Sequence, residues 1–247
     1  MQVIEKLLKV FFLILLCCAP AQAGINHRIN SGYFYSEGDY GYKKITYLHY
    51  VPVSYLYHLG RHRLGLGTGW LHIRGPSLEG VLTRPSAYSE GLADTYIRYQ
   101  YRRLLQHRRV LVELKTQIKI PTADSKRGLG TGKYDADMRL AYRHFLRFFW
   151  LSAQAKYKWR QDLTTIELKE TWGVDAGFIY AWSPGFSTML QAQFEQAHTA
   201  FGENKKNIIL LNSLKLARPL SLSIYISKGF SLSSPQWSSG LQTTLSW

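Results

Sequence analysis

The sequence predicts an all-β protein: a transmembrane antiparallel up-and-down β-barrel of about twelve strands, behind an N-terminal signal peptide. Three observations predict this fold class. The chain starts with a short charged and apolar leader, most of the remaining chain alternates between polar and apolar residues, and short connections alternate strictly with longer ones. Alternation with a period of two marks strands that have one polar and one apolar face.

The leader has the three parts of a secretory signal peptide. Two lysines lie near its start, residues 10–18 form an apolar run, and residues 21–23 read Ala-Gln-Ala, the small-x-small pattern that signal peptidase cuts. The apolar run is too short for a membrane anchor, since a spanning helix needs about 20 residues. We therefore expect cleavage after Ala23, a signal peptide over 1–23 and one barrel domain over 24–247.

Both cysteines, Cys17 and Cys18, lie inside this leader. A lipoprotein is discounted because the residues before them, a leucine and a cysteine, are not the small residues of a lipidation signal. The mature chain would then have no disulfide, no thiolate metal site and no cysteine nucleophile. We expect neither a cofactor nor a metal.

Composition narrows the class further. Aromatic residues make up 14% of the chain, including 17 tyrosines, and no segment after the leader approaches a membrane helix. The net charge is +15, and +14 once the leader with its two Lys and one Glu is removed. A basic protein can bind nucleic acid, but an exported chain rarely meets it and these charges are interleaved with apolar residues. No nucleic-acid partner is expected.

The alternation locates the strands. The clearest run is 94–102, in which Ile97 and Tyr99 face one way while Arg98 and Gln100 face the other. The usual run length suits a tilted strand, which needs about 9–11 residues to cross a bilayer. We expect strands at 27–36, 41–57, 61–73, 91–105, 108–120, 134–146, 148–160, 170–182, 185–197, 206–217, 220–230 and 238–247.

The connections support the same topology. Outer-membrane barrels have short periplasmic turns and longer outer loops, and closure leaves no unpaired edge in lipid. Both termini would then be periplasmic, which requires an even number of strands. Short turns are expected near 58–60, 106–107, 147, 183–184 and 218–219, and mostly longer connections at 37–40, 74–90, 121–133, 161–169, 198–205 and 231–237.

The last eight residues alternate and end in an aromatic residue, Trp247. This pattern resembles the C-terminal signal that outer-membrane proteins present to the barrel-assembly machinery. The alternative is an edge strand that happens to end in Trp. We favour the assembly signal, and with it the barrel-assembly machinery as a partner.

The segment 119–135 is more specific than a generic barrel hairpin. It resembles the K-x-P-T-x-D … G-x-G-T-G-x-x-D hairpin of the family named for the MetA pathway of phenol degradation, a set of outer-membrane transporters. The resemblance implies a β-barrel that passes hydrophobic or aromatic compounds. The matching positions are Pro121, Thr122, Asp124, Gly128, Gly130, Thr131, Gly132 and Asp135.

The hairpin also has a physical reading. Pro121 ends the strand because it has no N–H for the ladder, and Asp124 favours a turn through side-chain-to-backbone hydrogen bonds. We expect Gly128, Gly130 and Gly132 to adopt backbone angles closed to other residues. A phosphate-binding loop is rejected because it needs a helix directly after it, and the residues after this loop alternate as a strand.

A second glycine run, Gly65, Gly67 and Gly69, occupies alternate positions and hence one face of a strand. The missing side chains would either leave space inside the barrel or let a loop pack closely. Both explanations stay open.

If the apolar faces point to lipid, the polar faces line the interior. Ten cations against six acids would draw anions into a narrow channel; alternatively, the two signs pair across strands and plug the lumen. The inward residues expected are Arg98, Arg102, Lys115, Lys119, Arg139, Arg143, Lys156, Lys158, Arg160 and Lys215, with Asp94, Glu113, Asp135, Asp137, Asp175 and Glu195.

Basic residues also flank the predicted turns and would form a periplasmic rim. The hypothesis is that this rim contacts anionic phospholipid head groups; solvated charge that aids solubility is the alternative. Lipopolysaccharide and phospholipid are the expected lipid partners. The rim residues are Arg61, His62, Arg63, Arg102, Arg103, His107, Arg108, Arg109, Arg143, His144, Arg147 and Arg218.

Some outer-membrane barrels are lipid-modifying enzymes with a Ser–His pair near the interface. His72, close to Ser77 and Glu79, is the best candidate for such a pair here, and no histidines have metal-ligand spacing. We expect a pore or transporter for a small-molecule solute, gated by loops 74–90 and 121–133, rather than an enzyme. The alternatives are a lipid-modifying enzyme and a closed structural or adhesive barrel.

Overall fold

The computed structural model describes residues 27–41, 44–78, 82–83, 88–105, 109–163, 168–199 and 202–247, so the expected signal peptide lies outside the described chain. No helix of the described residues is long and apolar enough to cross a membrane. The strands are β1 (His27–Gly38), β2 (Thr46–Leu59), β3 (His62–Arg74), β4 (Ser77–Leu78), β5 (Leu82–Thr83), β6 (Tyr88–Leu92), β7 (Thr95–Leu105), β8 (Val110–Ile120), β9 (Asp135–Leu146), β10 (Phe149–Arg160), β11 (Thr171–Ser183), β12 (Phe186–Glu195), β13 (Lys205–Lys215), β14 (Leu220–Gly229) and β15 (Trp237–Ser246).

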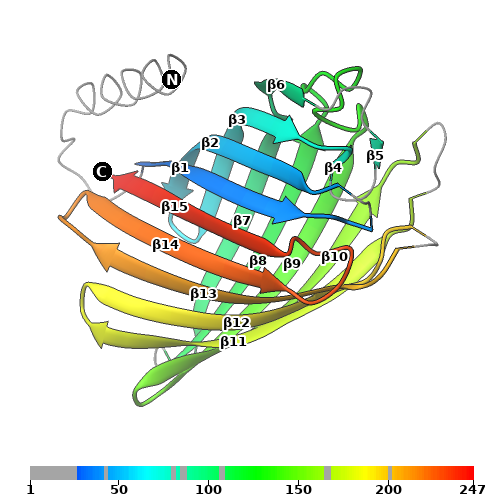
Figure 1. The fold of residues 1–247 in the computed structure, drawn as a ribbon. Helices are drawn as coiled ribbons and strands as arrows, with labels where there is room; N and C mark the ends of the chain where they lie inside the picture. The colour runs from blue at the N-terminus through cyan, green and yellow to red at the C-terminus, as the bar shows by residue number, and fades with distance from the viewer. Residues whose placement is uncertain are drawn as a thin grey trace.

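Twelve long strands of the described chain form a closed antiparallel ring (Figure 1). β1 pairs with β2, β2 with β3 and β3 with β7; from β7 each strand pairs with the next until β15 returns to β1. Each long strand therefore neighbours the next long strand of the chain, and the β1–β15 seam closes the ring. The predicted twelve-strand up-and-down barrel is confirmed.

The connections give the barrel two unlike ends. The turn end carries the β2–β3, β7–β8, β9–β10, β11–β12 and β13–β14 connections together with the C-terminus, and the loop end carries the longer ones. In Figure 1 the C-terminus and the β11–β12 and β13–β14 turns lie at the left, opposite the longer connections. Gly60 (φ +60°) and Arg147 (φ +44°) adopt left-handed backbone angles within two of these turns. The predicted alternation of short and long connections is confirmed.

The strand that comes after the longest connection is interrupted. β6 pairs with the loop-end half of β3, and β7 pairs with its turn-end half. From Leu92 to Tyr96 the chain advances by four residues while the partner on β3 advances by three, so an extra residue forms a β-bulge. The sequence predicted one continuous strand over 91–105. Because of the bulge, Ala93 and Asp94 are both buried although they are adjacent.

Apolar side chains cover the outer face of the ring. On β11, Trp172, Val174 and Phe178 are exposed, whereas Thr171 and Asp175, which have the opposite parity and lie on the other face, are buried. This pattern is the reverse of a water-soluble sheet and is expected when the outer face contacts lipid.

Outward-facing aromatic residues gather near both ends of the strands. Tyr180 and Trp182 contact each other near the turn end with ring centroids 4.6 Å apart, and Tyr157 and Trp159 do so near the loop end at 4.8 Å. Two such girdles are typical of barrels that cross a bilayer.

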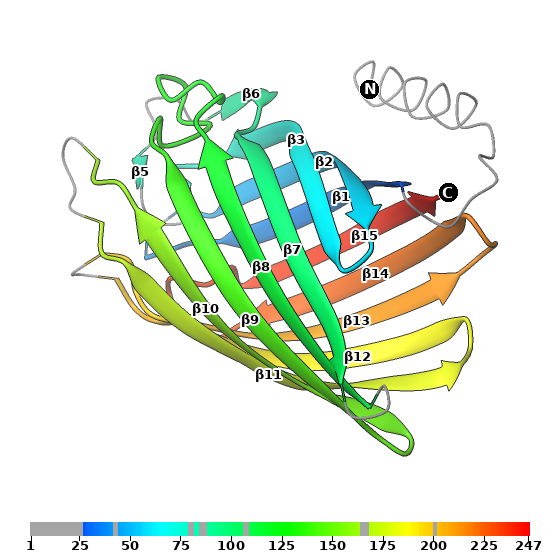
Figure 2. The same cartoon turned by 180° about the vertical axis from the view of Figure 1, so that it is seen from behind.

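A small apolar core lies inside the barrel at its loop end. Leu71 and Ile73 of β3 pack there with Ala93, and the connection 121–134 adds Ala123 and Leu129. Figure 2 shows this connection beside β6 at the loop end, above β7 to β9. The interior therefore has an apolar surface on which one loop packs, next to a charged surface on the inner wall.

A charged inner face as the candidate functional site

Strands β7 to β10 carry most of the charge on the inner face. Their register places Arg63, Gln100, Lys115, Arg139 and Lys156 opposite one another on β3, β7, β8, β9 and β10. Like charges directly opposite each other are unfavourable. Four cations in this row therefore need compensation from neighbouring rows.

Glu113 of β8 provides part of that compensation. Its side chain is 4% exposed and lies 3.2 Å from Arg143 Nη1, 3.6 Å from Lys115 Nζ and 3.7 Å from Arg102 Nε. It also accepts a hydrogen bond of 2.8 Å from Gln100 Nε2. One buried carboxylate thus serves three cations.

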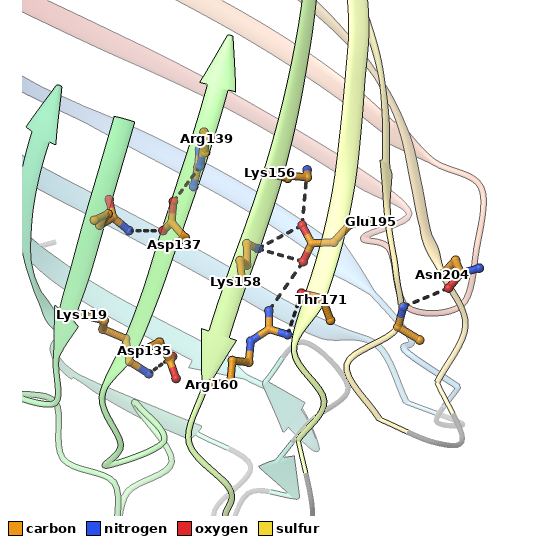
Figure 3. A network of polar contacts seen from close by, with 12 residues as sticks. Lys119, Asp135, Asp137, Arg139, Lys156, Lys158, Arg160, Thr171, Glu195 and Asn204 are labelled. Carbon is orange, nitrogen blue, oxygen red and sulfur yellow. Dashed lines mark hydrogen bonds and ion pairs between the residues drawn. The ribbon is translucent and has the colours of Figure 1, made fainter. Parts of the chain in front are cut away.

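Glu195 of β12 does the same for β10 (Figure 3). Its carboxylate lies 2.8 Å from Lys158 Nζ, 3.3 Å from Lys156 Nζ and 3.6 Å from Arg160 Nη2. The pairs reach across β11, where Gly173 lies opposite both Lys156 and Glu195. A Cβ on Gly173 would come within 2.4 Å of Lys156 Cε, so the glycine lets the lysine cross the strand.

Two further acids complete the pairing on this face. Asp175 of β11 lies 3.0 Å from Lys156 Nζ and accepts a 2.8 Å hydrogen bond from Gln154. Asp137 lies 2.9 Å from Arg139 Nε and accepts a 3.2 Å hydrogen bond from Gln117. Together with Lys119, which pairs with Asp94 and Asp135, each of the six inward acids has a cation, while several cations share an acid.

Lys119 connects the barrel wall to the loop end. Its Nζ lies 2.6 Å from Asp135 and 3.5 Å from Asp94, and it donates a 2.7 Å hydrogen bond to Thr131 Oγ1. Asp94 in turn accepts a 3.1 Å hydrogen bond from the backbone N–H of Ala123. Wall and loop are thus joined by buried polar contacts.

The connection 121–134 folds as the sequence predicts at some positions. Asp124 accepts hydrogen bonds from the backbone N–H groups of Lys126 and Arg127 at 3.0 and 3.3 Å. Gly128 and Gly132 have φ of +68° and +67°, the left-handed region that favours glycine. The turn assigned to Asp124 is therefore present.

Gly130 does not adopt the backbone angles that the sequence predicted for it. It is not among the residues with positive φ. A Cβ there would lie 2.9 Å from both Ala123 Cβ and an Asp94 carboxylate oxygen. The glycine is required by close packing against Asp94, not by backbone conformation.

Arg63 and Arg98 are held by neutral groups. Arg98 Nε donates a 2.7 Å hydrogen bond to Gln117 Oε1, and Arg63 Nη1 donates one of 3.4 Å to Gln100 Oε1. Neither arginine takes part in an ion pair found among the described residues. Their positive charges are oriented without being neutralised.

Two cavities meet at Arg98. A cavity of about 440 Å³ at the loop end is lined by apolar residues such as Tyr50 and Leu129 together with Lys119 and Asp135. A second, of about 330 Å³, lies deeper and is lined mainly by polar and charged residues. Arg98 lines both cavities, so it lies at the border between the apolar and the polar part of the interior.

The structure places the predicted inward residues on the inner face. Lys215 has the inward parity of β13, but it ends that strand at the turn end, where it is exposed and apart from the others. The family-like positions Pro121, Asp124, Gly128, Gly130, Gly132 and Asp135 all belong to the loop seated on the inner core or to its border with β9. The residues brought together are Arg98, Arg102, Lys115, Lys119, Arg139, Arg143, Lys156, Lys158, Arg160, Asp94, Glu113 and Asp137.

Three cations that the structure places on the inner face were not predicted there from the sequence. Arg28 on β1 donates a 3.2 Å hydrogen bond to Ser246 Oγ, and Lys205 lies opposite Glu195 at the loop end. Arg63 was assigned to the turn rim, but it lies one residue inside β3 and points inward. The signal was available, because Arg63 has the same parity as Gly65 and Gly67.

The second glycine run serves side-chain packing. A Cβ on Gly69 would lie 2.5 Å from Cε2 of Tyr50, and one on Gly67 would lie 3.0 Å from Ser54 Cβ. The run thus lets inward side chains of β2 lie flat over β3, which is neither of the two explanations predicted.

His72 lies on the outer face between aromatic neighbours. Its ring centroid is 5.2 Å from that of His49 and 4.9 Å from that of Tyr88. The Ser77 side chain and Glu79 lie outside the described chain, so the structure does not test this candidate for the alternative, enzymatic interpretation. Among the described residues no group of His, Cys, Asp or Glu has the arrangement to hold a metal ion.

Solved structures share this fold. A COG4313 outer membrane channel from Pseudomonas putida F1 aligns over 93% of this chain and 100% of its own, with a TM-score of 0.75 and 14% identity. The KdgM porin aligns over 88% and 99%, with 0.57 and 8%. The beta domain of the Bordetella autotransporter BrkA aligns over 91% and 100%, with 0.53 and 9%.

No family model and no curated protein matches the chain, so the resemblance to the phenol-degradation transporter family stays a prediction. The structural relatives include a channel, a porin and an autotransporter domain. What they share with this chain is the outer-membrane type of β-barrel, and fold alone does not assign an activity.

Proposed function

We propose that the chain forms an outer-membrane channel through which small solutes diffuse, anions in preference to cations. The observation that carries the proposal is the charge of the inner face. The nine predicted cations that lie there are joined by Arg28, Arg63 and Lys205, against six acids. A narrow low-dielectric passage with surplus positive charge concentrates anions and repels cations.

The arrangement of pairs also bears on whether the lumen is plugged. Glu113 and Glu195 each hold three cations against the wall. Side chains held against the wall leave the axis clearer than long side chains that meet across it. The two cavities along the inner face are consistent with a partly occluded, rather than filled, passage.

The connection 121–134 is the proposed gate. It is seated by Leu129 in the apolar core and by the Lys119 contacts with Asp94, Asp135 and Thr131. A solute entering at the loop end would pass beside it. The second predicted gate, 74–90, contains residues outside the described chain and is proposed on its length alone.

Fewer observations support aromatic or hydrophobic compounds as the solutes. The family resemblance implies them, and the apolar wall of the loop-end cavity would suit them. The deeper cavity is mainly polar, however, and favours charged solutes. We therefore propose small anions first.

The proposed location is the outer membrane, with loop end outward and turn end periplasmic. It rests on the predicted signal peptide, the apolar outer face and the two aromatic girdles. Lipopolysaccharide, phospholipid and the barrel-assembly machinery would be its partners there.

The test is single-channel recording of the refolded mature protein in planar bilayers under a tenfold KCl gradient. An ideally selective pore would reverse at about 59 mV, and we expect a smaller reversal potential with the sign of anion preference. The double variant Lys158→Gln/Arg160→Gln should move it toward zero, while the turn-end variant Arg147→Gln should not. A reversal potential of cationic sign would refute the preference, and silence from demonstrably folded protein would favour a closed structural barrel.

A further inference from the structure

We infer that the deeper cavity is a binding site for one small oxyanion that carries several negative charges, of the di- or tricarboxylate or phosphate class. The inference rests on the proposed function and goes beyond it, because diffusion needs only a general surplus of charge. A binding site needs a defined set of groups at one place. The cavity between β2, β3, β7, β8 and β9 provides them.

The charges that line this cavity are strongly unequal. Arg63, Arg98, Lys115 and Arg139 line it, with Asp137 as the acid. Its volume of about 330 Å³ is at the lower end of small-molecule sites. A small anion with oxygens on more than one side could therefore contact several cations at once.

The two arginines are oriented for a ligand. Their hydrogen bonds to Gln100 and Gln117 fix the guanidinium groups but leave their charge intact. A carboxylate at either glutamine position would have formed an ion pair with the arginine. Guanidinium groups present paired N–H donors that match the oxygens of carboxylate and phosphate.

Of the other two cations, Lys115 is only partly compensated, whereas Arg139 has an ion pair of its own. Lys115 lies 3.6 Å from Glu113, but that carboxylate is shared with Arg102 and Arg143. Arg139 lies 2.9 Å from Asp137. Since Arg63, Lys115 and Arg139 belong to one row of the sheet, a bound anion would also relieve their mutual repulsion.

The lining also selects the class of ligand. Apart from Leu56, Tyr99 and Thr116 the cavity is lined by charged and amide side chains, so an apolar body would lose its hydration without gaining contacts. A single charge would leave most of the cationic surplus uncompensated. A small polar anion with two or three charges fits both conditions.

The position of the cavity would make transport saturable. Arg98 also lines the loop-end cavity, so the site adjoins the space that an anion would enter beside the connection 121–134. Occupancy by a slowly leaving anion would interrupt the flow of chloride through the same passage.

The test is isothermal titration of the full mature barrel in detergent with citrate, inorganic phosphate and chloride, which does not require an open pore. The decisive variant is Gln117→Glu, which keeps the side-chain size, gives Arg98 a carboxylate partner and removes the hydrogen bond that Gln117 donates to Asp137. Arg63→Gln/Arg98→Gln removes the two oriented charges instead. Gln191→Glu is the matched control, because it adds the same charge on the inner face of β12, outside the cavity.

We expect citrate or phosphate to bind the unaltered protein at least tenfold more tightly than chloride. Gln117→Glu and the double arginine variant should each weaken that binding at least tenfold, and Gln191→Glu should change it by less than twofold. In bilayers citrate should block the chloride current of the unaltered protein and not that of Gln117→Glu.

Failure of the site and failure of the pore give different results. Conduction without citrate or phosphate binding, or binding unchanged in Gln117→Glu, overturns the site and leaves the channel standing. Binding without any conduction supports the site and overturns the channel. Equal loss of binding in Gln191→Glu would show that overall lumen charge, rather than this cavity, is responsible, and would also overturn the site.

Discussion

Replacing Glu195 by Gln keeps the shape of the side chain and removes the charge that holds three cations. Lys158, Lys156 and Arg160 would then face one another with Asp175 as the remaining acid close to them. Because the Glu195 side chain is 8% exposed, water replaces the lost charge poorly. We expect the folded barrel to be destabilised.

The magnitude can be worked from the geometry. Removing one partner of a buried ion pair costs about 3–5 kcal/mol. Lys158 and Arg160 keep 24% and 15% of their side-chain exposure, so solvent screens part of their repulsion. The lower end, about 3 kcal/mol, is therefore expected, and this is roughly a hundredfold change in the folding equilibrium.

The assay is urea unfolding of the protein in lipid vesicles, followed by tryptophan fluorescence. Glu90→Gln is the control: Glu90 accepts a hydrogen bond from Tyr88 on the outward side of β6 and should tolerate the change within about 0.5 kcal/mol. Adding Lys158→Gln to Glu195→Gln should recover part of the loss. If Glu195→Gln unfolds at the same urea concentration as the control, the three cations are stabilised by water rather than by this carboxylate, and the reasoning fails.

Three other changes test separate parts of the structure. Leu129→Ala removes an apolar anchor of the connection 121–134, and truncating a buried leucine costs about 2–5 kcal/mol. We therefore expect faster trypsin cleavage in that connection and longer high-conductance events in bilayer recordings. Unchanged cleavage would contradict the packing of this loop on the inner core. Gly69→Ala places a Cβ 2.5 Å from the Tyr50 ring and should destabilise the barrel by about 1–3 kcal/mol in urea, whereas Gly185→Ala, with its nearest contact at 3.7 Å, should be neutral. Trp247→Ala should lower insertion into the outer membrane of cells while refolding in detergent is unchanged; equal insertion would rule out the assembly signal.

The strands were predictable because period-two alternation needs no knowledge of distant partners. The expected strands 134–146 and 148–160 correspond to Asp135–Leu146 and Phe149–Arg160. The bulge before β7 was not predictable. Whether Ala93 and Asp94 both point inward depends on how β3 pairs with β6 and β7. The alternation of residues within this segment carries no information about that pairing.

For the candidate site, the face on which each residue lies was predictable, but its partners were not. Parity was enough to put Lys158 and Glu113 on the inner face, but pairing across β11 depends on the registers of two neighbouring strands and on Gly173 between them. The seating of Leu129 was also missed. The signal was weak, since a single leucine between two glycines has no periodicity to identify it as part of a core.

The seam between β1 and β15 has a consequence for how the barrel is made. Its contacts join positions such as Arg28 and Ser246, 218 residues apart, whereas every other pair joins long strands that follow one another in the chain, most of them as hairpins. Contacts between distant positions require a large loss of chain entropy before they stabilise anything. The hairpins can therefore form early, and the ring closes last. Until Trp247 exchanges backbone hydrogen bonds with His27, at 2.9 and 3.0 Å, the sheet has two open edges, and an unpaired edge is the part of a growing β-protein most exposed to wrong partners.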